Sequence, residues 1–180
     1  MLKEYEIENK TLLLFPYFIL LIGFGSSIYH FFNNPFTLIG DLLPIYIFVS
    51  FLVFLLVNRL TNNGLLALLA PLGLIIAQLL INIRFPHLFL SAPTHHSVNL
   101  LIFAVLFTLL YKKFGKIVLG LIPSILLYTG GIFIRSFDFL LCPLTIVGAH
   151  VMWHLLVALS IYLVVKFFVK LEIYSCNHKK

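Results

Sequence analysis

The sequence predicts an all-α membrane protein, a polytopic bundle of transmembrane helices. Of its 180 residues, 62% are hydrophobic and only 10% are charged, and the mean hydropathy is +1.11. Soluble globular domains contain about 25% charged residues. The apolar residues occur in runs of about 20, the length that crosses a hydrocarbon core. No soluble domain or linker separates these runs, so we expect a single integral membrane domain over residues 1–180.

Six apolar runs have the length of a membrane span. They cover approximately residues 11–32, 37–57, 64–81, 94–111, 116–134 and 143–169. Residues typical of turns separate neighbouring runs: Asn33-Asn34-Pro35, Thr61-Asn62-Asn63-Gly64 and Lys112-Lys113-Phe114-Gly115. A cleaved signal peptide with its apolar core at 12–22 is an alternative for the first run. It is disfavoured because the run continues through the small residues at 23–25.

The net charge of +6 predicts membrane orientation rather than nucleic-acid binding, because the basic residues lie between apolar runs. With six spans, ten of the twelve basic residues share one side with both termini, and only Arg84 and Arg135 fall on the other. Cytoplasmic loops carry an excess of Lys and Arg, so both termini are expected to be cytoplasmic. Cys142 and Cys176 flank the last run and are expected on opposite sides of the bilayer, too far apart to form a disulfide.

Polar residues within the predicted spans share one depth in the membrane. Ionisable residues in a bilayer are energetically costly, so they are candidates for a functional site. His30 is near the outer end of the first span, Asp41 is near the outer start of the second, and His150 and His154 are in the outer half of the last. Ser26 and His30 are four residues apart, as are the two histidines of the last span, so each pair shares a helix face. This agreement in depth favours one common site on the extracytoplasmic side.

The candidate residues match the requirements of a hydrolytic zinc centre. Three histidines with an open fourth position are typical of catalytic zinc, which makes His30, His150 and His154 the expected Zn2+ ligands. Zinc lowers the pKa of bound water to about 7 and polarises a carbonyl. Asp41 would accept the proton of the water and return it to a leaving amine. Ser26 has no adjacent base, so we expect it to hydrogen-bond the water or the developing oxyanion.

Each residue also has an explanation that needs no catalysis. A single membrane histidine is more often an interhelical hydrogen-bond partner, and Ser26 and Ser27 can allow two helices to pack closely. Asp41 can be favoured by the dipole at the start of its helix. Trp153 faces another side of the last helix than the histidines and is expected to pack rather than react. Pro123 and Gly130-Gly131 favour a flexible or kinked fifth helix that could admit a lipid.

Three blocks of the sequence resemble the alkaline ceramidases, which belong to a superfamily of membrane hydrolases that also includes the adiponectin receptors. The blocks resemble the family patterns G-x-G-S-x-x-[FY]-H, D-x-L-P-[MI]-Y and H-x-x-W-H. In this chain they are Gly23-Phe24-Gly25-Ser26-Ser27-Ile28-Tyr29-His30, Asp41-Leu42-Leu43-Pro44-Ile45-Tyr46 and His150-Val151-Met152-Trp153-His154. The resemblance implies zinc ligands at His30, His150 and His154. It also implies that Ser26 and Asp41 are the catalytic or water-positioning pair.

The resemblance implies a zinc-dependent amidohydrolase that cleaves a ceramide-like lipid of the bilayer into a sphingoid base and a fatty acid. It also implies a seven-helix fold, of which this chain lacks the first helix. Leu42 stands where the animal ceramidases have an acidic residue. Their calcium-binding acidic segment has no counterpart here beyond Glu4, Glu6 and Glu8, which we expect to be a solvated stretch near the cytoplasmic surface. Three alternatives are open: hydrolysis of a lipid ester, a zinc-containing lipid receptor without turnover, and a proton or metal transporter.

Overall fold

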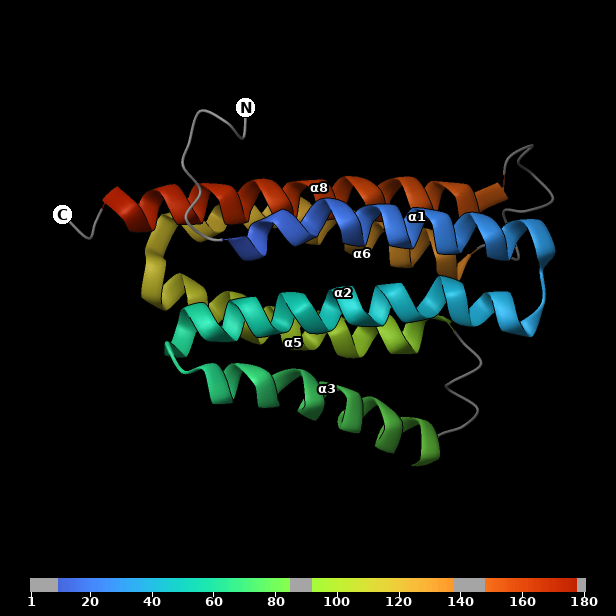
Figure 1. Cartoon of the computed structure of the whole chain (residues 1–180), viewed down its shortest axis with the longest axis horizontal. Coiled ribbons are helices and arrows are strands. Elements are labelled where there is room, and N and C mark those ends of the chain that lie inside the picture. The colour runs from blue at the N-terminus through green and yellow to red at the C-terminus, as the bar shows by residue number, and fades with distance from the viewer. Residues whose placement is uncertain (1–9, 85–91, 138–147, 178–180) are drawn as a thin grey trace. The chain divides into compact units, whose positions relative to one another are not determined.

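The computed structural model describes residues 10–84, 92–137 and 148–177, and every regular element in these ranges is helical. The predicted all-α class is therefore confirmed for this part of the chain. The elements, in chain order (Figure 1), are η1 (Lys10–Leu14), α1 (Phe15–Phe32), α2 (Pro35–Thr61), α3 (Gly64–Arg84), α5 (Ala92–Phe114), η2 (Gly115–Leu121), α6 (Ile122–Ser136) and α8 (Gly148–Asn177).

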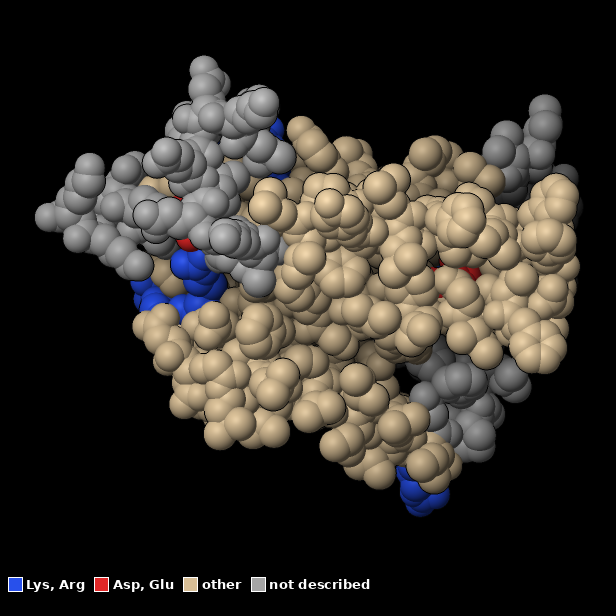
Figure 2. Space-filling view, viewed as in Figure 1, with Lys and Arg blue, Asp and Glu red and all other residues tan. Residues whose placement is uncertain are grey.

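Within the described residues, five helical stretches are long and apolar enough to cross a membrane. They are Leu12–Phe32, Pro35–Thr61, Gly64–Ile81, Val98–Ser136 and Val151–Tyr174. Uncharged side chains make up most of the visible described surface (Figure 2), as expected where lipid replaces water. The count differs from six because the fourth and fifth predicted spans fall in the single stretch Val98–Ser136.

The long stretch Val98–Ser136 does not continue as one straight helix. A straight helix of its 39 residues would be about 58 Å long, roughly twice the thickness of a hydrocarbon core. Gly115 interrupts it with a φ of +66°, and the chain turns through η2 so that α6 packs against α5 (Figure 1). Pro123 lies in the first turn of α6, where no backbone N–H bond is lost. Pro123 therefore lies at the start of α6, where the predicted fifth span divides between η2 and α6.

The predicted turn residues end and begin helices. Asn33 and Asn62 have positive φ values of 45° and 52°, in the left-handed region that asparagine tolerates better than most residues. Asn34 then caps the start of α2, where its Oδ1 accepts two backbone N–H groups. Asn63 caps α3 in the same way. Each of these asparagine pairs therefore reverses the chain, one residue ending a helix and the next beginning another.

The structure divides into two compact units, residues 1–51 with 164–180 and residues 52–163. The first unit has an aromatic core around Phe15, which is fully buried. Its ring centroid lies 6.1 Å from that of Phe48, 5.6 Å from that of Phe51 and 5.6 Å from that of Phe168. In this unit the start of α1 therefore packs against both α2 and the end of α8.

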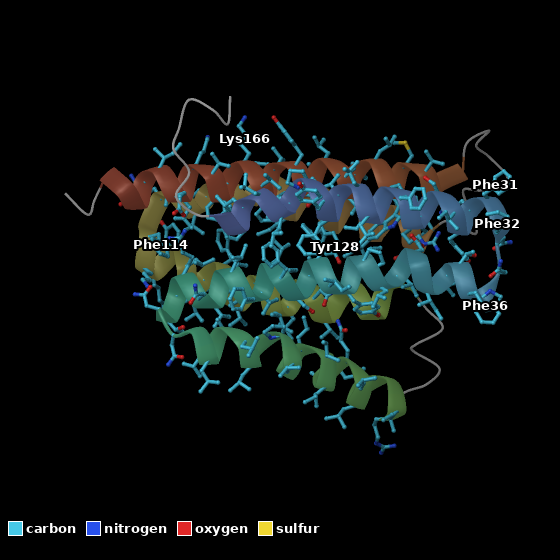
Figure 3. All side chains as sticks on the ribbon, viewed as in Figure 1. Phe31, Phe32, Phe36, Phe114, Tyr128 and Lys166 are labelled. Carbon is cyan, nitrogen blue, oxygen red and sulfur yellow. The ribbon has the colours of Figure 1, made fainter. Side chains whose placement is uncertain are left out.

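Aromatic side chains also surround the turn between α1 and α2. Phe31 and Phe36 are 83% and 86% exposed (Figure 3). The rings of Phe31 and Phe32 meet edge to face, with 4.9 Å between their centroids. Aromatic rings are enriched at the two membrane–water interfaces. This turn therefore has the composition of an interfacial segment.

Buried polar side chains join pairs of helices within the second unit. Gln78 of α3 donates a hydrogen bond from Nε2 to Asn99 Oδ1 of α5 at 2.7 Å, and both side chains are buried. Ser124 of α6 and Ser160 of α8 each donate from Oγ to the backbone carbonyl of the other at 3.0 Å. These pairs join α3 to α5 and α6 to α8 between mostly apolar spans.

Candidate functional site

The first group of candidate residues lies where α1 and α2 touch backbone to backbone. A Cβ atom added to Gly25 would fall 3.0 Å from the carbonyl carbon of Gly40, still closer to its oxygen, and 3.6 Å from the backbone nitrogen of Asp41. Only a residue without a side chain permits this approach. The crossing brings the segments that carry Ser26 and Asp41 together.

Ser26 and Asp41 are both buried beside this crossing, each with 8% of its surface exposed. Oδ1 of Asp41 is inaccessible and has no hydrogen-bond partner among the described residues. Nearly all buried polar atoms in proteins are paired, so an unpaired carboxylate oxygen requires an explanation. Burial of Ser26 also fits the alternative that a small residue allows close helix packing.

The neighbouring candidates on α1 differ from Ser26 in their surroundings. Ser27 is exposed and donates from Oγ to the carbonyl of Gly23 at 2.7 Å, so its own helix satisfies it. His30, one turn after Ser26, is exposed, and its ring lies 5.3 Å from that of Tyr29. Of the three polar residues on this segment, only Ser26 is buried beside Asp41.

His150 and His154 are both in α8, one helical turn apart as predicted. His154 is half-buried, whereas the side chain of His150 lies outside the described residues. The predicted start of this span at 143–147 and Cys142 also lie outside them. Ser26, His30 and Asp41 belong to the first compact unit and His154 to the second.

Among the described side chains, no group of three His, Cys, Asp or Glu residues could hold a metal ion. The predicted zinc triad includes His150, whose side chain is not among those described. The triad of His30, His150 and His154 therefore stays a prediction. The structure does bring Ser26 and Asp41 to one helix crossing, and this relationship does not depend on the triad.

Trp153, between the two histidines of α8, packs against α6 within the second unit. Its indole is 7% exposed and lies 6.0 Å, between ring centroids, from Tyr128. Gly131 of α6 lies directly against the same ring. The prediction that Trp153 packs is confirmed. Gly131, one of the glycines for which the sequence predicts flexibility, packs against this indole.

Comparison of the chain with protein-family models, with curated proteins and with solved structures gives no match. The resemblance to the alkaline ceramidases therefore rests on the three motif blocks.

Proposed function

We propose that this chain is a zinc-dependent intramembrane hydrolase that cleaves a lipid amide bond, with a ceramide-like lipid as substrate. The observation that carries the proposal is Oδ1 of Asp41, buried at the Gly25–Gly40 crossing without a partner in the described part of the chain. An ionisable group in an apolar span is costly, and such groups usually serve ion, proton or substrate chemistry. Asp41 is the acidic residue expected to handle the proton.

The residues fit a zinc ion by their chemistry. His30, His150 and His154 would hold Zn2+ through neutral imidazole nitrogens, a common ligand set of catalytic zinc. When bound, Zn2+ supplies a Lewis acid that lowers the pKa of water and polarises a carbonyl. Oδ1 of Asp41 fits the same centre, since an acceptor with no partner among the described residues is available for a proton from water or substrate.

The protein side chains then move one proton and stabilise one charge. Oδ1 of Asp41 accepts the proton of the attacking water and afterwards donates it to the leaving amide nitrogen, so the carboxylate is restored after each turnover. The hydroxyl of Ser26 donates a hydrogen bond to the carbonyl oxygen as negative charge develops there. The apolar side chains of the spans keep bulk water away and strengthen both interactions.

The proposal includes a membrane topology of six spans, with Val98–Ser136 crossing twice. The turn at Gly115 and the return of α6 along α5 support two crossings. Both termini are then cytoplasmic and the site is extracytoplasmic. Cys142 and Cys176, the two cysteines of the chain, test this. A membrane-impermeant maleimide should label Cys142 from outside intact cells and Cys176 only after permeabilisation; labelling of both from one side would exclude six spans.

The function is tested by metal analysis and lipid hydrolysis on purified protein in nanodiscs. Wild type should contain one zinc per chain and hydrolyse ceramide. His30→Ala, His150→Ala and His154→Ala should lose zinc and activity together. Asp41→Asn should keep zinc and lose activity. Full hydrolysis by His150→Ala without bound metal would exclude the proposed function.

Matched controls separate the serines and the alternative functions. Ser26→Ala should lower turnover by about 100-fold, the effect of removing an oxyanion donor, whereas Ser27→Ala should not, because Ser27 bonds its own helix. A lipid ester with the same chains is assayed beside ceramide. Preference for the ester assigns ester hydrolysis to the site, and zinc and lipid binding without turnover assigns a receptor.

A further inference from the structure

The contact between α6 and α8 is unusually close at Gly131. A Cβ atom added there would lie 3.0 Å from Cε3 of Trp153, 3.3 Å from its Cζ3 and 3.5 Å from Cβ of Leu156. Most real Cβ contacts are longer, so even alanine would displace the indole. Gly130, the preceding residue, is different, since a Cβ atom there would meet no described atom within 4 Å. Only the second glycine of the pair is therefore required by packing.

A second contact fixes the same helix pair in the same register. Ser124 and Ser160 exchange hydrogen bonds, with 2.9 Å between their hydroxyl oxygens. Gly131 lies seven residues after Ser124, and Trp153 lies seven residues before Ser160. Two contacts one heptad apart hold the antiparallel helices against both sliding and rotation. Of the two, the one at Trp153 is next to the histidine pair.

We propose that Gly131 and Trp153 are positioning residues for the metal centre, an inference that rests on the proposed function. The indole fills the space left by the absent side chain of Gly131 and so fixes the rotation of α8 about its axis. By helical periodicity, positions 150 and 154 lie about 60° and about 100° around the helix axis from position 153, both in the same rotational direction. The rotation that the indole fixes is therefore also the rotation of positions 150 and 154 about the helix axis.

A small change in this rotation is large for a metal site. A side-chain atom lies roughly 5–6 Å from the helix axis, so a rotation of only about 3° moves it by about 0.3 Å. Metal–ligand distances tolerate only about 0.2 Å. Displacing the indole by adding one methyl group at Gly131 should therefore weaken metal binding without removing any ligand.

The test is zinc affinity of the full-length protein in nanodiscs, measured by competition with a chromophoric chelator. Gly131→Ala should weaken zinc binding by about tenfold or more, as loss of supporting residues does in other metal sites. Gly130→Ala should stay within about twofold of wild type, because its Cβ meets no described atom. Trp153→Phe in the Gly131→Ala background should restore most of the affinity, since the smaller ring makes room for the methyl group.

Fluorescence of the metal-free protein gives a readout independent of activity, because Trp153 is the only tryptophan of the chain. Gly131→Ala should shift its emission maximum and Gly130→Ala should not. Ser124→Ala serves as a control for stability, because it weakens the same helix contact away from the indole. It should lower the unfolding temperature with little change in zinc affinity.

The outcomes distinguish this inference from the function on which it rests. If wild type binds no zinc, the proposed function fails and the positioning role fails with it. If wild type binds zinc and Gly131→Ala binds it equally well, only the positioning role is overturned. Should Gly131→Ala fail to fold, Trp153→Phe alone decides: weakened zinc binding supports the inference, and unchanged affinity overturns it.

Discussion

Gly25 of α1 lies against the carbonyl group of Gly40 of α2, and the residues that follow them, Ser26 and Asp41, are the two buried polar side chains of that crossing. The contact is one-sided. A Cβ atom on Gly25 would collide with α2, whereas a Cβ atom on Gly40 would meet no described atom within 4 Å. The crossing therefore depends on one glycine only.

Gly25→Ala should separate α1 from α2 and displace Ser26 relative to Asp41. Forcing extra volume into a close contact costs about 1–3 kcal/mol, so the unfolding temperature in detergent should fall and lipid hydrolysis should fall with it. Gly40→Ala is the matched control and should leave both nearly unchanged. Equal effects of the two substitutions would show that the helices do not cross as described.

Replacing Asp41 should separate stability from function. Its buried Oδ1 has no partner within the described residues, so burying this oxygen costs folding free energy that no hydrogen bond from them offsets. Asp41→Asn and Asp41→Leu should therefore abolish hydrolysis, while the metal-free protein unfolds at the same or a higher temperature. A clear loss of stability in both variants would mean that Asp41 is a structural residue, as the helix-dipole explanation holds.

The sequence predicts the elements better than the contacts between them. The asparagine pairs and Gly115 mark the ends of helices through local backbone preferences, and the structure places helix ends there. Gly130 and Gly131 look equivalent in the sequence. Which of them contacts Trp153 depends on the rotation of α6, and that is set by packing against α8 rather than by spacing along the chain.

In the candidate site, too, the sequence predicts the position of residues along the helices but not the contacts between them. Depth along the spans selects Ser26, His30 and Asp41 together, because depth follows from counting residues in an apolar run. It does not distinguish the buried Ser26 and Asp41 from the exposed His30. That difference arises from the Gly25–Gly40 approach, which the sequence shows only as two glycines on different helices.

Substitutions of the hydrogen-bonded amides Gln78 and Asn99 should have non-additive effects on the free energy of unfolding. Gln78→Leu leaves Asn99 buried without its donor and should cost about 1–2 kcal/mol. The double variant with Asn99→Leu should recover most of this loss, because neither polar group then remains. Thr108→Val is the control on α5, since the exposed Thr108 bonds its own helix at Ala104. Thermal unfolding of the single and double variants measures these effects. If the loss of stability in the double variant equals the sum of the single losses, the hydrogen bond is contradicted.

Lys113 should stabilise the end of α2 through hydrogen bonds rather than through charge alone. Its Nζ donates to the carbonyls of Arg59 at 2.6 Å and Leu60 at 2.9 Å, which lie in the last turn of α2, where carbonyls have no intrahelical donor. A cation at this position contributes about 0.3–1 kcal/mol. Lys113→Met should therefore lower the unfolding temperature and speed amide exchange in the last turn of α2. Lys112→Met removes the same charge one residue away and should do neither; equal effects from both lysines would assign the stabilisation to charge.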